Sequence, residues 1–465
     1  MTDISGSGLC RLTVRTPQRV VDLAVPADVP VADLLPILLE HAGDNLAEQG
    51  VEHGGWVLQR LGEEPLDEEA TPEALTLRDG EMLHLRPRTE ALPPIHFDDL
   101  VDGVATTMRE RPHGWEARTS RWLLRGTAVV LPAAGLLVLA LPGGSAPLRA
   151  AVAAGTALLV LFGAASASRA VGDSAAGAAL GMLVAPYLAL AGALLPVGDA
   201  DAGGQLLGSR LLAASAAAAG GAVLAVAAVA AFVPLLLCTA VIAVAGALWG
   251  VLMLTLDVPA AHAASIVAVL AVVFGGLVPG IAFRLSGLRL PALPTDAEQL
   301  QEGIEPHPHQ RVVSRTALAE EWMTALYTAV GVVCAGVLTA LVLDEPATAS
   351  LVTAAVLCLL LLLHARGIGN VWQRPAVLLP GLYGVVLMAV RAAGEMPAAE
   401  RPVLLAGLLT AAAASAVASW TVPGRRLLPY WGRAADILHS LAAVALIPLA
   451  LWVLGVYSAL RTVTG

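Results

Sequence analysis

The side chains with most potential for chemistry in this chain are ionisable groups that lie next to long apolar segments. Within a bilayer such groups are costly, and they usually mark ion pathways, proton relays or catalytic centres. Here they fall at or near the ends of the apolar segments: Arg169, Asp173, Asp257, His262, Arg284, His364, Arg366 and Arg391. At these positions we interpret them as interfacial anchors whose charged ends reach the headgroup region, rather than as transport sites.

Motifs for metal binding and catalysis are not found in the sequence. His307 and His309 form one close histidine pair, but Pro308 between them predicts a loop, and no Cys, Asp or Glu stands at metal-ligand spacing. Every basic residue apart from histidine is an arginine, so a GxxxxGK[ST] nucleotide-binding loop is impossible, and energy from ATP must come from another subunit. HExxH and GxSxG are absent as well. We therefore expect no catalytic residue, no metal and no cofactor, and the chain is not predicted to be an enzyme.

The elements that position these residues are predicted to be membrane-spanning helices. The 465 residues are 57% hydrophobic and 14% charged, which is too little polar cover for a soluble domain of this length. A spanning helix needs about 20 mostly apolar residues. About eleven such runs are present, at residues 123–143, 149–169, 174–196, 208–230, 233–254, 262–284, 322–343, 347–365, 374–391, 401–420 and 435–459. The fourth and fifth runs have the weakest boundary, since only Phe232, Val233 and Pro234 separate them.

Charge is distributed unevenly along the chain and predicts its orientation. Residues 1–122 hold 22 acidic residues against 11 arginines, whereas the remainder holds 15 against 16. Arginines concentrate in short loops on the cytoplasmic side. With a cytoplasmic N-terminus, 13 arginines flank the inner ends of the runs and 5 flank the outer ends. We therefore expect a multi-pass protein of the cell membrane with its N-terminus in the cytoplasm and, since the span number is odd, an extracytoplasmic C-terminus.

Two segments outside the spans are candidates for contact with partners or with the membrane surface. Residues 285–321 form the longest break between spans and are predicted to be a cytoplasmic loop, with a helix starting near Ala317. Residues 90–122 are predicted to be a linker that contains an amphipathic helix, because apolar residues recur at helical spacing after Pro93-Pro94. The membrane-interface anchors predicted at the start of the first span are Trp115, Arg118, Arg121, Trp122 and Arg125.

The first 89 residues have the pattern of a small α+β domain. Apolar residues alternate with polar ones in two segments around Leu12 and Leu23, which a short turn joins into a hairpin. A helix follows from Pro30 to Gly43, with apolar residues at i, i+3, i+4 and i+7. Two further strands are predicted, one starting at Trp56 and one after the Asp79-Gly80 turn. This ββαβ…β order is that of a β-grasp, or ubiquitin-like, fold.

The spacing of three segments resembles the ubiquitin-like domain of type VII (ESX) secretion systems: LTVRTPQRVVDLAVPADVPVADLLPILLEH, WVLQRLG and LRDGEMLHLRP. Joined through a linker to eleven spans, this domain resembles EccD, the multi-spanning membrane subunit of the secretion core. The resemblance covers essentially the whole chain. It implies a non-enzymatic scaffold or channel-forming subunit that forms a dimer and assembles with the B and E membrane subunits. It also implies that the cytoplasmic domain docks an FtsK/SpoIIIE-like ATPase, that the spans enclose a lipid-filled vestibule, and that no nucleic acid is bound.

Charged residues outside the spans are the predicted partner-binding residues. They are Glu63, Glu64, Asp67 and Glu68 in an acidic loop of the ubiquitin-like domain, and Arg289, Arg311 and Arg315 in the central cytoplasmic loop. Long-range attraction between such groups and a charged partner raises association rates. A conjugation tag is excluded, because the domain ends in Leu85-Arg86-Pro87-Arg88 and runs on into more chain.

Two other classes of protein remain as alternatives. A secondary transporter with a regulatory cytoplasmic domain would show an internal repeat and polar sites near the middle of its spans. The six-plus-five division of the spans and the charges at their ends do not fit that pattern. An intramembrane enzyme would need a catalytic constellation, which the sequence does not show.

Overall fold

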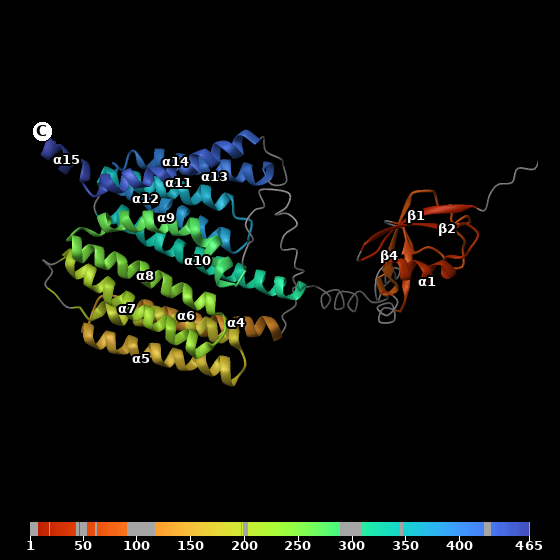
Figure 1. Ribbon diagram of the computed structural model, residues 1–465, viewed down its shortest axis with the longest axis horizontal. Helices are drawn as coiled ribbons and strands as arrows, with labels where there is room; N and C mark the ends of the chain where they lie inside the picture. Colours follow the sequence, from red (N-terminus) through yellow and green to blue (C-terminus); the bar gives the residue numbers. More distant parts are fainter. Residues whose placement is uncertain are drawn as a thin grey trace, which may run out of the picture. The chain divides into compact units, whose positions relative to one another are not determined.

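The computed structural model of the protein describes residues 8–17, 19–42, 46, 54–60, 63–90, 117–196, 198, 203–288, 308–344, 347–422 and 429–464. Contacts divide the chain into two compact units, Met1–Glu116 and Ala117–Gly465, which we call the head and the membrane unit (Figure 1). The amphipathic helix predicted within residues 90–122 lies outside the described residues, except where the first membrane helix has already begun.

The head contains a four-stranded mixed sheet in the order β2-β1-β4-β3. Its elements are β1 Leu9–Arg15, β2 Val20–Pro26, α1 Val31–Ala42, β3 Trp56–Gln59, β4 Glu81–Pro87 and the short 3-10 helix η1 Arg88–Glu90. β1 and β2 form the predicted antiparallel hairpin, and the first and last strands pair in parallel, with Val14 opposite Leu83. A parallel central pair flanked by antiparallel neighbours is the sheet of a ubiquitin-like domain, so the predicted fold class of the head is confirmed.

The core of the head lies between the sheet and α1. Val14, Leu83 and Leu85 point inward from the two central strands, and Leu34 and Leu38 cover them from the helix. Because strand side chains alternate between faces, the residues between them point to the opposite side of the sheet. The indole of buried Trp56 donates its N–H to the carbonyl oxygen of Leu46 at 2.7 Å, so its one polar group is satisfied within the core.

The described residues of the membrane unit include eleven helices that are long and apolar enough to cross a bilayer, as predicted. Their bounds are α4 Ala117–Ala140, α5 Ala146–Ala165, α6 Ser174–Leu194, α7 Gly203–Val229, α8 Val233–Leu256, α9 Ala260–Leu285, α10 His309–Leu343, α11 Thr348–Arg366, α12 Gln373–Glu395, α13 Arg401–Thr421 and α14 Pro429–Val453. The π-helical turn η2 Ser166–Ala170 extends α5, and the short helix α15 Val456–Thr464 follows α14.

The weakest predicted boundary, between the fourth and fifth spans, is a tight turn. Ala230 and Phe232 both adopt left-handed backbone conformations, which are uncommon for residues other than glycine and which end α7. Pro234 then stands in the first turn of α8, where its missing N–H and fixed φ suit a helix start. Three residues are therefore enough to reverse the chain.

The helices of the first half pack through small residues. A Cβ added at Gly221 of α7 would lie 2.9 Å from Ala185 Cα of α6, and one added at Gly250 of α8 would lie 2.8 Å from the Gly208 carbonyl oxygen of α7. Such distances mean that the helix backbones touch. In a bilayer, where apolar burial contributes little, close backbone approach is a main source of packing energy.

The second half is built around α10 and has a larger apolar core. Leu338, Leu341 and Leu357 are fully buried where α10 packs with α11, and α9, α12 and α14 complete the cluster. In Figure 1 α9 and α10 lie between α5–α8 on one side and α11–α14 on the other. α13 differs from its neighbours, because none of its side chains is buried within the chain.

Several helix ends differ from the predicted limits, and two of the differences have a clear physical cause. α10 begins at His309 rather than near Ala317, so the helix takes up a third of the predicted loop at 285–321. Charged residues such as Arg311 and Glu320 end the apolar run but are good helix formers, so the helix continues outside the bilayer as far as Pro308. The last span ends at Val453 rather than 459, because Gly455 adopts φ +73° and closes α14 as a glycine cap.

Candidate functional site

Some of the ionisable groups at the span ends bind backbone groups at helix termini. The last carbonyl groups of a helix have no partner within it. At the end of α7, the Ala228 carbonyl oxygen accepts from Arg169 Nε at 2.8 Å, and that of Val229 accepts from Ser168 Oγ at 2.7 Å. The π-helical turn η2 thus places two donors on the end of α7.

At helix starts, carboxylates play the complementary part and accept backbone N–H groups. Asp173 caps α6 by accepting the Ala176 N–H at 3.0 Å, and it forms an ion pair with Arg125 of α4 at 2.5 Å. The Ala176 N–H, with Arg125 adding to it, holds the pKa of the Asp173 carboxyl below its usual value. Asp344 accepts the Ala261 N–H at the start of α9. These contacts give the charged groups structural roles in joining helices.

The acidic loop of the head is only partly available to a partner. Glu63 lies 3.4 Å from Arg60, and Glu68 is paired with Arg88. Asp67 accepts the Glu69 backbone N–H through one oxygen and is exposed, as is Glu64. The structure therefore brings the four predicted acidic residues together on one loop, but internal ion pairs neutralise two of them.

The outer face of the head sheet carries a mixed basic and apolar surface, of which the sequence prediction named no residue as partner-binding. Arg15 of β1 pairs in register with His84 of β4 and with Val20 of β2. Exposed Met82 and Arg86 lie on the same face, because they alternate with the buried Leu83 and Leu85. The strand alternation visible in the sequence identifies this face. We call Arg15, Met82 and Arg86 the outer sheet surface.

The predicted cytoplasmic arginines and interface anchors are only partly described. Arg311 and Arg315 lie on the extension of α10, where Arg315 Nη1 donates to the Ser286 carbonyl oxygen at 2.7 Å and thus holds the end of α9. Trp122 is 63% exposed on α4, and Arg121 is exposed beside it. Arg289 and Trp115 lie outside the described residues, as does the side chain of Arg118.

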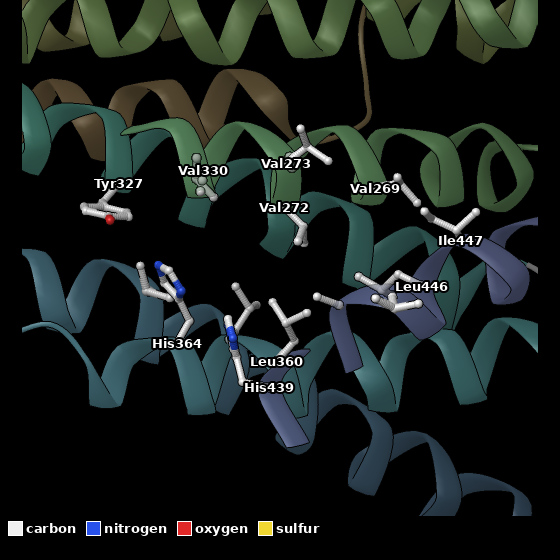
Figure 2. A pocket seen from close by; sticks show the side chains of 17 residues that line it. Val269, Val272, Val273, Tyr327, Val330, Leu360, His364, His439, Leu446 and Ile447 are labelled. Atoms are coloured by element: carbon white, nitrogen blue, oxygen red, sulfur yellow. The ribbon is translucent and has the colours of Figure 1, made fainter. Parts of the chain in front are cut away.

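A cavity of about 350 Å³ lies between α9, α10, α11, α12 and α14. Figure 2 shows His364 of α11 and His439 of α14 at one end of it, near Tyr327, while Leu446 and Ile447 lie at the other end. The remaining lining is almost entirely aliphatic, with Val272, Val330 and Leu360 among its members. We call this space the histidine cavity.

The two histidines stack on each other inside this apolar surround. Their ring centroids are 5.4 Å apart with planes inclined by 25°, and Tyr327 is 5.8 Å from His364. The Nε2 atoms of both imidazoles are buried and find no hydrogen-bond partner among the described residues. An unsatisfied buried polar atom costs about 1–3 kcal/mol, so two at one place point to a missing partner. His364 was predicted to be an interfacial anchor, and His439 was not singled out because it stands alone in an apolar run.

A metal is not the partner that this geometry suggests. Among the described residues no group of three His, Cys, Asp or Glu side chains is close enough to hold a metal ion. Stacked imidazoles present their faces to each other, whereas metal ligation requires nitrogen lone pairs to converge on one point.

Two protein-family models match the chain. The EccD-like transmembrane domain matches residues 120–463, and the YukD protein of the WXG100 protein secretion system matches residues 9–85. The two matches correspond to the membrane unit and to the sheet domain of the head.

Proteins with known names or structures give the same result. The ESX-4 secretion system protein eccD4 of Mycobacterium tuberculosis is 29% identical over 98% of both chains, in the strains CDC 1551 and H37Rv. Two solved structures share the fold with TM-scores of 0.58 and 18% identity. One is protomer 1 of the ESX-3 core complex, and the match covers 97% of this chain and 100% of that chain. The other is the MycP5-free ESX-5 inner membrane complex, and the match covers 89% of this chain and 99% of that chain. The chain therefore belongs to the EccD family, the multi-spanning membrane subunits of type VII secretion systems that carry an N-terminal ubiquitin-like domain.

Proposed function

We propose that this protein is a non-enzymatic membrane scaffold of a type VII secretion complex. The observation that carries the proposal is that both units match parts of such systems, the head through residues 9–85 and the membrane unit through residues 120–463. The solved structures that share the fold belong to a core complex and an inner membrane complex. This likeness supports assembly with other membrane subunits, for which the B and E subunits are our candidates.

The head is proposed to dock the FtsK/SpoIIIE-like ATPase on the cytoplasmic side. Its two charged surfaces are the exposed pair Glu64 and Asp67 on the acidic loop and the outer sheet surface. Met and Arg are both enriched at protein interfaces. On this ground the outer sheet surface, where His84 lies opposite Arg15 and between Met82 and Arg86 on β4, is the better candidate for the main contact.

Affinity capture of the full chain from its native membranes in mild detergent tests this docking. Wild type is expected to recover the ATPase together with other membrane subunits. A double variant Arg15→Glu, Arg86→Glu should lose most of the ATPase while keeping the membrane subunits, because charge reversal at a rim costs association rate and adds repulsion. Glu40→Arg, an exposed position on α1, is the matched control.

Two outcomes would contradict the proposal at different levels. If the reversed outer sheet surface retains the ATPase while Glu64→Arg, Asp67→Arg loses it, the acidic loop is the docking surface. Recovery of the self-associated chain alone from wild type, without ATPase or other membrane subunits, would overturn the secretion function itself.

Self-association as a dimer is proposed to involve the helices that bury nothing in the single chain. α13 has no buried side chain, and its Leu405 and Leu409 are exposed. The four native cysteines are buried, so an introduced cysteine reports without background. Leu409→Cys should form a disulfide-linked dimer on mild oxidation in membranes, whereas a wholly monomeric product would place the second copy elsewhere.

A further inference from the structure

The histidine cavity has a polar end and an apolar end, and they lie at different depths. His364 stands two residues before the end of α11 at Arg366, about 3 Å along the helix axis. On α14, Ile447 lies eight residues beyond His439, so the cavity runs inward by about 12 Å. Arg366 forms an ion pair with Asp436 of α14, one helical turn from the histidines. Because such charged side chains lie at the level of the lipid headgroups, this end of the cavity lies at that level too. The imidazoles therefore sit just below the membrane surface.

The cavity opens sideways from the bundle between α9 and α14. Val273 is 57% exposed, Val444 is 67% exposed and Ile447 is 54% exposed, although all three line the cavity. Around helices of this length and hydropathy the surrounding medium is hydrocarbon. Water has nothing to bind along an aliphatic wall, so the deep part of the cavity suits a chain of methylene groups.

We propose that the histidine cavity holds one phospholipid of the surrounding bilayer, with an acyl chain in the aliphatic part and its ester or phosphate oxygens bonded to Nε2 of His364 and His439. The polarity along the cavity matches that of the molecule, since the imidazoles lie at headgroup depth and the aliphatic lining lies below them. A neutral imidazole donates its Nε2 hydrogen to an oxygen acceptor, which lipid esters and phosphates supply. The volume of about 350 Å³ falls within the range of small-molecule sites.

This proposal is independent of the secretion function and goes beyond it. It assigns a lipid site within one chain, lined by five of its own helices. A second copy of the chain or a partner's helix inserted at the mouth would fill the aliphatic part but would leave the two Nε2 atoms without partners, unless it brought a polar group of its own.

Photo-cross-linking of a lipid probe to the full chain tests the site. The probe is phosphatidylglycerol with a diazirine on one acyl chain, used at low mole fraction in phosphatidylcholine nanodiscs. In wild type the label should concentrate on cavity residues of α9 and α14, such as Val273 and Val444, over similarly exposed positions on α5 such as Leu158. Label spread evenly over all lipid-facing helices would overturn the proposal without any variant being made.

Variants on one helix give a matched comparison. Gly276 of α9 lines the cavity, whereas Gly280, one turn further along the same helix, does not. A Cβ added at either position would meet no atom within 4 Å. Gly276→Leu should lower labelling of the cavity at least about fivefold by filling its mouth, whereas Gly280→Leu should leave it unchanged. Equal labelling of the two variants would contradict the proposal.

The polar end is tested with imidazole replacements that preserve stacking. The double variant His364→Phe, His439→Phe should lower lipid labelling of the cavity at least about fivefold. That change corresponds to losing the net free energy of about one hydrogen bond or more. His262→Phe, at the opposite end of α9, is the control. A diazirine-labelled alkane without a headgroup should label wild type and the double variant alike. Displacement of the lipid by inorganic phosphate, or cross-links to a second copy in place of lipid, would overturn the proposal.

Discussion

At the scale of single residues, several charged side chains in the described part of the protein join one element to another. Arg60 and Glu81 show this in the head. Arg60 Nε donates to Glu81 Oε1 at 2.6 Å, and its guanidinium also reaches the Leu75 carbonyl oxygen, while Glu81 accepts the Arg78 N–H. The pair joins the end of β3 to β4 and fixes the loop that precedes β4.

Replacing Glu81 should weaken the head in a pH-dependent manner. The hydrogen bond from Arg60 holds the pKa of the Glu81 carboxyl below its usual value. A carboxyl with a lowered pKa contributes stability above its unfolded pKa, about 4.3, and that stability is lost as the pH falls through the folded value. Glu81→Gln should cost about 1–3 kcal/mol at pH 7, and its difference from wild type should disappear in acid. Hydrogen exchange of β4 peptides in the full chain measures this.

The control for this prediction lies on the loop between β3 and β4. Glu64→Gln changes an exposed carboxyl and should alter exchange in β4 little. A difference between Glu81→Gln and wild type that stayed constant down to pH 3 would show that the ion pair is not the cause.

At the scale of elements, glycine positions determine how closely α6, α7 and α8 approach. Gly220 and Gly221 are neighbours on α7, yet a Cβ at Gly221 would meet the backbone of Ala185 while one at Gly220 would meet nothing within 4 Å. Small residues are abundant in this part of the sequence, and they favour close helix packing. The sequence did not show which of two adjacent glycines faces a helix, because that depends on the rotation of α7 against α6.

This pair gives a prediction with an internal control. Gly221→Leu should destabilise the membrane unit by about 1–3 kcal/mol or more, because overpacking forces two backbones apart. Gly220→Leu should be tolerated. Thermal aggregation of detergent-purified protein, followed by size-exclusion chromatography, separates the two, and an equal loss of the monodisperse peak in both would contradict this helix interface.

Sequence reasoning at this scale identified the head strands and the eleven spans, because hydrophobic periodicity and run length are local properties. The start of α10 was placed eight residues too late, because charged residues end an apolar run without ending a helix. The histidine cavity was missed altogether. His364 and His439 are 75 positions apart in the sequence, and only the antiparallel contact of α11 with α14 brings them together.

At the scale of the whole molecule, orientation is a prediction that rests on the distribution of arginine. Ser314 on the extension of α10 and Ala398 between α12 and α13 are exposed and belong to opposite sides of the membrane in the predicted topology. The native cysteines are buried, so single introduced cysteines report accessibility.

Labelling with a membrane-impermeant maleimide tests this topology. Ala398→Cys should react in right-side-out membrane vesicles and Ser314→Cys should react only in inverted ones. The opposite pattern would place the head outside the cell and would exclude contact with a cytoplasmic ATPase.

The length of α10 has a mechanical consequence. At 35 residues it measures about 52 Å, while the hydrocarbon core of a bilayer is about 30 Å thick. It has no internal proline, and its membrane part is the most deeply buried of the spans. The core leucines therefore hold the middle of the helix, while about 20 Å of its N-terminal end extends outside the membrane. A force applied to that extension would be transmitted directly to the centre of the bundle, because the helix has no flexible joint.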